Sequence, residues 1–214
     1  MNAVTGEIDR RVSFVRDVPV RTLRDQVAMR TETLKQGKAK RLITQNSNLL
    51  VGKYHYFRSY VRPWLGRVNV ETGKVECLEL PLQLARVPNK KDAYVWYAEP
   101  KAKGDPQLKN QAIVASDLKN SRGFKVVGDK RSHGNGWGHI ASPTPTVAGD
   151  HLYVPVMNGT VYVIKWKAAK LGASAVVAIN DLGMAGQSWT RASVSFAGGR
   201  AFAHTIRELI CIGK

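Results

Sequence analysis

The stretch SPTPTVAGDHLYVPVMNGTVYVI, residues 142–164, decides the fold class of this chain. Two runs of alternating apolar residues, 151–156 and 160–164, flank the dipeptide Asn158-Gly159. Asn-Gly between alternating runs is the strongest short-range signal for a β-hairpin, because both residues tolerate the positive φ of a tight turn. The stretch therefore predicts two antiparallel strands joined by a tight turn, preceded by a second turn at Gly149-Asp150.

Similar short runs fill most of the chain after residue 41, with turn residues between them. The further predicted strands are 49–57, 66–70, 75–80, 93–97, 113–117, 124–127, 175–179, 192–196, 200–204 and 208–212. Glycine-containing turns at 71–74 and 120–123 join two pairs of them. This density of short strands predicts an all-β protein.

The strands recur with a period. Tyr56 and Val154 are 98 residues apart, and Val154 and Phe202 are 48 apart, so a missing copy is expected near 95–105. The turn sequence VTGEI at 4–8 also matches ETGKV at 71–75. A period of 40–50 residues built only from strands is typical of β-propeller blades, which cover their faces only by stacking on neighbours.

The quoted stretch resembles the repeat of pyrroloquinoline-quinone-like propellers, which runs from Ser-Pro through a Gly-Asp turn, a strand, a Gly-Thr turn and a second strand. Residues 68–75 resemble the closing strand pair of that repeat, and residues 193–213 resemble a last blade. The resemblance extends over about 47–214. It implies a propeller, and it implies a periplasmic or secreted protein although the chain shows no signal peptide. Closed rings in this family have seven or eight blades, so we expect a piece of a longer protein.

The predicted fold is a partial β-propeller of about three and a half four-stranded blades in an open arc. The blades are expected at about 47–80, 93–128, 143–183 and 188–212, within a propeller region 42–214. Residues 1–17 are predicted to form the closing hairpin of an incomplete blade. Residues 18–41 are predicted to form a helical insertion, with the helix at 18–36, because Val20, Leu23, Val27 and Leu34 line up on one helical face.

Catalytic and cofactor features are not indicated. The quinone enzymes place Trp four residues after the turn glycine, where this chain has Arg10, Cys77 and Val127. Cys77 and Cys211 are far from adjacent, and no acidic calcium cluster is apparent. We therefore predict no catalytic residue, no metal and no cofactor; both cysteines lie in apolar strands and are expected to be buried. A remnant of a quinone-dependent dehydrogenase is the alternative.

The loop HGNGWGH at 133–139 is the candidate ligand site, with His133, Asn135, Trp137 and His139 as the binding residues. Such loops line the central channel of propellers. A structural glycine-rich turn is the competing interpretation. Metal binding is a weaker one, since a spacing of six between two histidines is not a known zinc pattern.

The chain is strongly basic, with 33 Lys and Arg against 16 Asp and Glu and a net charge of +17. The excess is spread along the chain without a run of five like charges, so specific nucleic-acid binding is not favoured over a solvated cationic surface or a polyanion-binding surface. No apolar run is long enough to span a membrane. An open arc would leave blade faces uncovered, so we expect aggregation or a protein partner that supplies the missing blades. The prediction is thus a non-catalytic propeller scaffold for protein or envelope interaction, and a basic polyanion- or nucleic-acid-binding module is the second alternative.

Overall fold

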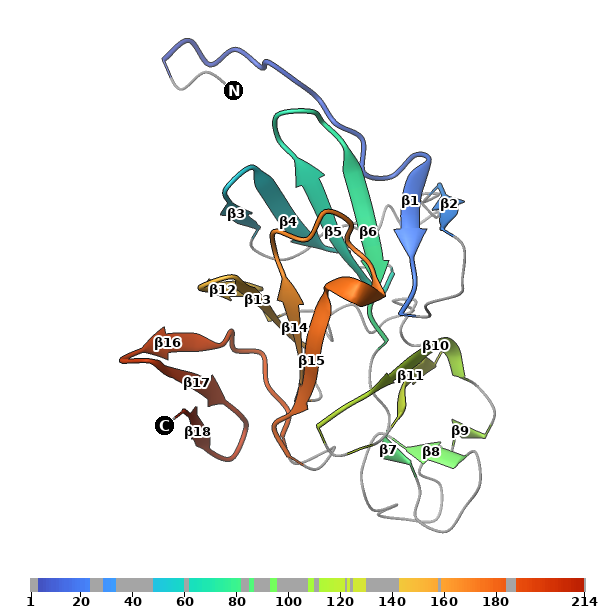
Figure 1. Cartoon of the computed structure of the whole chain (residues 1–214), viewed down its shortest axis with the longest axis vertical. Helices are drawn as coiled ribbons and strands as arrows, with labels where there is room; N and C mark the ends of the chain where they lie inside the picture. The colour runs from blue at the N-terminus through green and yellow to red at the C-terminus, as the bar shows by residue number, and fades with distance from the viewer. Residues whose placement is uncertain are drawn as a thin grey trace.

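The computed structural model describes residues 4–23, 29–33, 48–59, 62–81, 85–86, 93–95, 108–109, 112–121, 123, 125–129, 143–157, 159–183 and 188–213. Within these residues the chain is all-β, as predicted, apart from one 3₁₀ turn, η3 (Ala173–Ala175). The described strands form five sheets (Figure 1). The described part holds no helix with the length and apolar character that crossing a bilayer requires.

The first sheet contains the blade predicted near 47–80. Its six strands are β1 (Val18–Arg21), β2 (Arg30–Glu32), β3 (Leu49–Val51), β4 (Tyr54–Arg58), β5 (Trp64–Asn69) and β6 (Val75–Glu79). Strands β3 to β6 form an antiparallel meander, with the predicted turn at 71–74 between β5 and β6. Strand β1 pairs in parallel with β6, and β2 pairs with β1 at the edge.

Two further meanders follow near the C-terminus. One contains β12 (Thr146–Ala148), β13 (His151–Pro155), β14 (Thr160–Lys165) and β15 (Val176–Asp181), and the other contains β16 (Ser195–Ala197), β17 (Arg200–His204) and β18 (Leu209–Ile212). Both meanders lie where blades are predicted, and the predicted hairpin joins β13 to β14. Gly159 in that turn has φ +92°, and a Cβ there would lie 2.3 Å from the Ser188 hydroxyl oxygen. Only glycine fits this turn.

The region between these meanders, where a blade is predicted at 93–128, is described only in part. Its strands are β7 (Ala85–Arg86), β8 (Ala93–Val95), β9 (Leu108–Lys109), β10 (Ala112–Lys119) and β11 (Lys125–Asp129). Strands β7 to β9 form one sheet, and β10 and β11 form another. The hairpin predicted around 120–123 is present between β10 and β11. The predicted four-stranded unit at 93–128 stays a prediction, because the residues between these strands are described only in part.

The β3–β6 and β12–β15 meanders stack directly on each other (Figure 1). Tyr56, Leu65 and Leu78 from the first share a buried cluster with Leu152 and Tyr162 from the second. The Tyr56 hydroxyl also donates to the carbonyl of Trp166, at 2.8 Å. Val126 of the intervening segment belongs to the same cluster, and the amide of Ser121 donates to the carbonyl of Ile179 at 2.8 Å. The two meanders are therefore direct neighbours although 98 residues separate Tyr56 from Val154.

The other face of the β12–β15 meander packs against the β16–β18 sheet. Tyr153 contacts Phe196 with ring centroids 4.7 Å apart, and the Thr146 hydroxyl donates to the carbonyl of Val194 at 2.8 Å. Alternate side chains of one strand thus point to opposite neighbours. Three antiparallel meanders follow one another face to face, which is consistent with a partial β-propeller.

The helix predicted over 18–36 is wrong where that segment is described. Val18 and Val20 are both buried on one side of β1, with Pro19 between them, so the period of the apolar residues there is two. Pairing of Val20 with Cys77 of β6 fixes the extended conformation. Pairing with a distant strand therefore overrides the helical spacing of the apolar residues. Val27 and Leu34, the other two residues of that spacing, lie outside the described residues.

The closing hairpin predicted for residues 1–17 does not form within the described residues 4–17, which contain no strand. Gly6 nevertheless has φ +74°, nearly equal to the +75° of Gly73 in the matching turn. Residues 4–11 are all exposed and run along the outside of the first sheet, while Phe14 and Val15 pack onto its outer face (Figure 1). We call residues 4–12 the N-terminal arm.

A buried ion pair joins three segments of the fold. The carboxylate of Glu76 on β6 accepts hydrogen bonds from Arg67 on β5 and, at 2.9 Å, from Arg21 on β1. Arg67 is 1% exposed, and it also donates to the carbonyl of Ala168 at 2.7 Å, in the segment that follows β14. Burial alone would raise the pKa of Glu76, but the hydrogen bond and charge of Arg67 outweigh it and hold that pKa below its ordinary value.

We predict that Glu76→Gln lowers the free energy of unfolding by about 3–5 kcal/mol at pH 7, because Arg67 would be left buried without its counter-charge. A carboxylate with a lowered folded-state pKa stabilises the protein above its unfolded-state pKa, and that stabilisation is lost as pH falls through the folded-state value. The two proteins should therefore converge in stability below the ordinary pKa of 4.5. Urea unfolding between pH 3 and pH 7 measures this.

Asp150→Asn is the matched control, since Asp150 forms an exposed pair with Lys167 at 2.8 Å. That variant should unfold as the unmodified protein does. Equal stability of the unmodified protein and the Glu76→Gln variant at pH 7 would contradict the importance of the buried pair.

Candidate functional site

A groove opens where three loops meet at one end of the last two meanders. The loops follow β13, precede β16 and join β17 to β18. The amide of Thr190 donates to the carbonyl of Met157 at 2.8 Å, and the amide of Ile206 donates to the carbonyl of Trp189 at 2.8 Å. Backbone hydrogen bonds therefore fix the middle loop between the other two, which positions the groove on a connected framework.

The groove has a volume of about 650 Å³, within the range of ligand-binding clefts. The residues that line it are Met157, Trp189, Thr190, Arg191, Ala192, His204, Thr205 and Ile206. We call this set the loop groove. Its floor is apolar, with Met157 buried and Trp189 half-buried, while Ile206 is 68% exposed at its edge.

The two threonine hydroxyls of the loop groove are used by the local backbone. Thr190 Oγ1 accepts from the amide of Ala192 at 3.0 Å. Thr205 Oγ1 accepts from the amide of Glu208 at 3.1 Å, as is common for threonine in turns. The hydroxyls therefore shape the loops, and the polar contacts open to a ligand come from other side chains.

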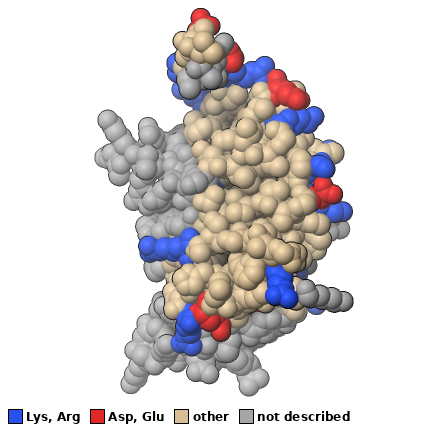
Figure 2. Space-filling view, turned by 90° about the vertical axis from the view of Figure 1, so that its left-hand side faces the viewer, with Lys and Arg blue, Asp and Glu red and all other residues tan. Residues whose placement is uncertain are grey.

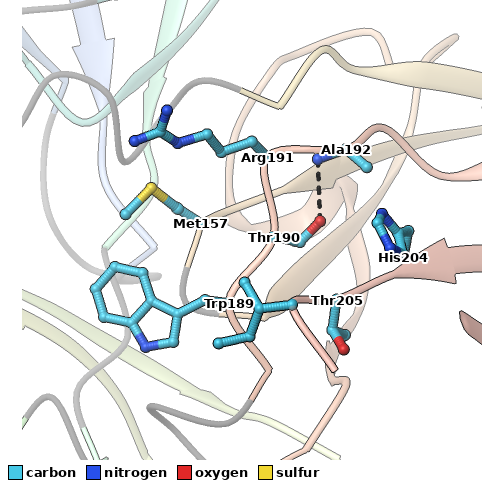
Figure 3. Close-up of a pocket in the computed structure, with 8 residues that line it drawn as sticks. Met157, Trp189, Thr190, Arg191, Ala192, His204 and Thr205 are labelled. Carbon is cyan, nitrogen blue, oxygen red and sulfur yellow. Dashed lines mark hydrogen bonds between the residues drawn. The ribbon is translucent and has the colours of Figure 1, made fainter. Parts of the chain in front are cut away.

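Arg191 and His204 supply those polar contacts. Both are exposed, and Figure 3 shows Arg191 on the same side as Met157 and Trp189, with His204 on the opposite side. Among the ion pairs of the described residues, none involves Arg191. An apolar floor beside a guanidinium and an imidazole suits an apolar group with a neighbouring carboxylate.

The predicted ligand site, His133, Asn135, Trp137 and His139, lies outside the described residues. The interpretation of that loop stays a prediction. Within the described residues, no group of three or more His, Cys, Asp or Glu side chains is placed to hold a metal ion.

The loop groove was not found from the sequence. Trp189 is interpreted there as part of the start of the blade at 188–212, and Ile206 lies in the turn between the predicted strands 200–204 and 208–212. A signal was available, because an isoleucine in a polar turn between two short strands has no strand partner to cover it. Trp189 lies beside the turn that contains Ile206 because the two residues share a backbone hydrogen bond between separate loops. The periodicity of the sequence does not show such a bond.

The two cysteines differ from the expectation that both are buried. Cys77 on β6 is fully buried, and burial raises the pKa of its thiol to about 12. Cys211 on β18 is exposed, because it lies on the outward face of the last sheet, and both thiols are free. Sequence composition predicts a buried thiol wherever a strand is apolar, but it does not show that a strand lacks a covering neighbour.

Comparison with known proteins gives structural similarity only. No protein-family model matches the chain, and no curated protein matches it. BamB from Moraxella catarrhalis is similar in its crystal structure, with 13% identity over 78% of this chain and 42% of that chain and a TM-score of 0.28. The computationally designed Ika8 protein is similar with 6% identity over 74% and 42% and a TM-score of 0.27. The chain thus spans less than half the length of either protein.

We predict that a water-soluble thiol reagent modifies one cysteine of the folded protein rapidly and the other only after unfolding. The reactive species is the thiolate. The Cys77 thiol is buried away from the reagent, and burial raises its pKa to about 12. Absorbance of the released chromophore counts the thiols with and without urea. Cys211→Ser should abolish the rapid reaction, whereas two rapid thiols in the folded protein would contradict the burial of Cys77.

Proposed function

We propose that this chain is a non-catalytic interaction module of the pyrroloquinoline-quinone-like propeller type, which binds a protein segment in the loop groove. The loop groove itself carries the proposal: apolar side chains held by backbone hydrogen bonds lie beside Arg191 and His204. A periplasmic or secreted location forms part of the proposal and rests on the repeat resemblance alone.

The chemistry of the groove favours a peptide with an apolar side chain next to an acidic one. Trp and Arg dominate the binding energy of many protein interfaces, because they bury a large area and form directional hydrogen bonds. Trp189 and Met157 offer the apolar contact, and Arg191 can hold a carboxylate with two parallel N–H bonds. The overall charge of +17 adds long-range attraction for an acidic segment.

The distribution of charge favours a local acidic contact over a nucleic-acid surface. On the face that Figure 2 shows, Lys and Arg side chains are scattered singly around a largely uncharged centre. Nucleic-acid sites need a stripe of basic groups that follows the phosphate backbone. The scattered pattern on this face supports a solvated cationic surface, on which Arg191 of the loop groove can act as a local contact for an acidic group.

The test uses three fluorescent peptides that share a Leu-Trp pair and differ only at flanking positions, which are Glu, Gln or Lys. We predict binding in the order Glu, Gln, Lys, and at least tenfold weaker binding of the Glu peptide by Arg191→Glu, since a hydrogen bond to a charged group contributes about 1.5–3 kcal/mol. Ile206→Ser should weaken all three peptides alike. Fluorescence anisotropy at fixed ionic strength measures the affinities.

Lys170→Glu is the matched control, because it changes charge equally on an exposed loop outside the groove. That variant should lose no more than a small, salt-dependent part of the affinity. Equal losses in Arg191→Glu and Lys170→Glu, or equal binding of the Glu and Lys peptides, would contradict the proposal.

A further inference from the structure

The last sheet has three strands, whereas the meanders before it have four. Strand β18 pairs with β17, and the described part of the chain places no strand along its other edge. An unpaired edge offers backbone N–H and C=O groups to an added strand. Leu209 and Ile212 of β18 are 66% and 48% exposed, so the edge is also apolar.

A cleft runs beside this edge, between the last sheet and the β12–β15 meander. Its volume is about 510 Å³, and it is lined by Val177 and Ala178 of β15 and by Ile212 of β18, among other apolar residues. Val177 is 50% exposed there. Strand β15 is the fourth strand of its meander, and in the described part of the chain no fourth strand of the last sheet covers its cleft-facing side. We call the β18 edge with this cleft the strand slot.

The N-terminal arm carries the sequence of a fourth strand. Its turn at Gly6 matches the turn at Gly73 in sequence and in φ, +74° against +75°. The residues that follow Gly73 form β6, the fourth strand of the first meander, and residues 8–12 correspond to Val75–Glu79. Val4 and Ile8 of the arm are 94% and 54% exposed. The arm is therefore an extended, partly apolar segment that forms no strand in its own copy.

The first meander also fixes the register that such a strand would adopt. Tyr54 and Arg200 each open the second strand of a meander directly after its tight turn. Counting along the paired strands from there, Ile212 corresponds to Val68 and Cys211 corresponds to Arg67. Val68 pairs with Val75, and Arg67 pairs with Glu76. The same register pairs Ile212 with Ile8 and Cys211 with Asp9.

We propose that residues 8–12 of one copy of this chain bind antiparallel to β18 of a second copy and complete its last sheet. In this register Ile8 enters the cleft beside Ile212, and Asp9 lies on the opposite face beside Cys211. Ile8, Arg10 and Val12 share the face toward the cleft, where Ile8 and Val12 supply the apolar contacts, and Asp9 and Arg11 share the polar outer face. The carboxylates of Glu7 and Asp9 also approach a strand pair that carries Arg200 and His204, in a protein whose copies otherwise repel.

A second copy, and not the same one, is the occupant because of where the arm lies. Figure 1 shows the N-terminus and the C-terminus at opposite ends of the row of sheets. Phe14 and Val15 pack on the outer face of the first sheet and anchor the arm there, whereas the contact of Val12 and the hydrogen bond from Arg10 to the carbonyl of Glu71, at 2.7 Å, are given up when the arm binds another copy. The whole stack separates that face from β18. Contact between different surfaces of successive copies is heterologous, so the assembly is a ring or a filament.

The native thiol of Cys211 provides a direct test. In an Asp9→Cys variant under mild oxidation, a disulfide should join residue 9 of one copy to residue 211 of another, since directly opposed residues have the required separation. Ile8→Cys is the matched control, because its side chain points to the other face. We expect at least tenfold more cross-linked oligomer with Asp9→Cys than with Ile8→Cys, and none with Asp9→Cys combined with Cys211→Ser. Non-reducing electrophoresis and mass spectrometry of the linked peptides measure this.

Light scattering of the unmodified protein gives the second measurement. The mass should rise with concentration, and Ile8→Asp should reduce the association, while circular dichroism shows that the variant remains folded. A disulfide within a monomer would show that the arm closes its own sheet and would overturn the proposal. Equal cross-linking of the two cysteine variants, or an unmodified protein that stays monomeric at every concentration, would also overturn it. None of these readouts depends on peptide binding in the loop groove.

Discussion

The buried carboxylate of Glu76 is the constraint on which the arrangement of the sheets depends. A charge without access to water is tolerated only when it is paired and hydrogen-bonded, and here Arg67 and Arg21 satisfy it from two other strands. Arg67 extends beyond the pair to the carbonyl of Ala168, so the same charge also positions the segment after β14. Apolar side chains in place of the buried ion pair could give equal stability, but they would not fix the orientation of the strands as directional hydrogen bonds do. The ion pair therefore contributes orientation: it fixes β1, the first meander and the second meander relative to one group.

Two further long polar side chains, Arg58 and Tyr162, cross the interface between the β3–β6 and β12–β15 meanders. Arg58 is buried at the end of β4 and donates to the carbonyl of Pro155, and burial lowers its pKa to about 10. Tyr162 donates to the carbonyl of Pro81 from the other side, and burial raises the pKa of that hydroxyl. Each long side chain crosses from one sheet to a backbone carbonyl near the next. Because these bonds are directional, the two sheets have one relative position, whereas apolar contacts alone would allow several.

Local patterns predicted what depends on local chemistry. The Asn158-Gly159 hairpin and the all-β class follow from turn residues and alternation, and the structure confirms them. Antiparallel meanders also lie near 47–80, 143–183 and 188–212, where blades are predicted. The helix at 18–36 was wrong because the burial of Val18 and Val20 comes from pairing with β6, 57 positions away at Val20. The blade at 93–128 stays a prediction, because part of that range lies outside the described residues. The loop groove was missed because it is formed by backbone bonds between loops of different sheets. Sequence periodicity carries no information on such contacts.

The last sheet shows how the loop groove and the fold are connected. The cleft between it and the β12–β15 meander is lined in part by small residues, Ala148, Ala201 and Ala203, which leave the two faces incompletely in contact. The bond of Thr190 to Met157 therefore helps to hold the last sheet on the β12–β15 meander, and the bond of Ile206 to Trp189 holds the loop between β17 and β18 on the same segment. These are the same loops that form the groove. A ligand that binds the ordered groove must stabilise the last sheet by mass action, in proportion to the logarithm of its concentration over its dissociation constant. Under the proposed function, occupancy of the groove therefore stabilises the last sheet, of which β18 is the edge strand.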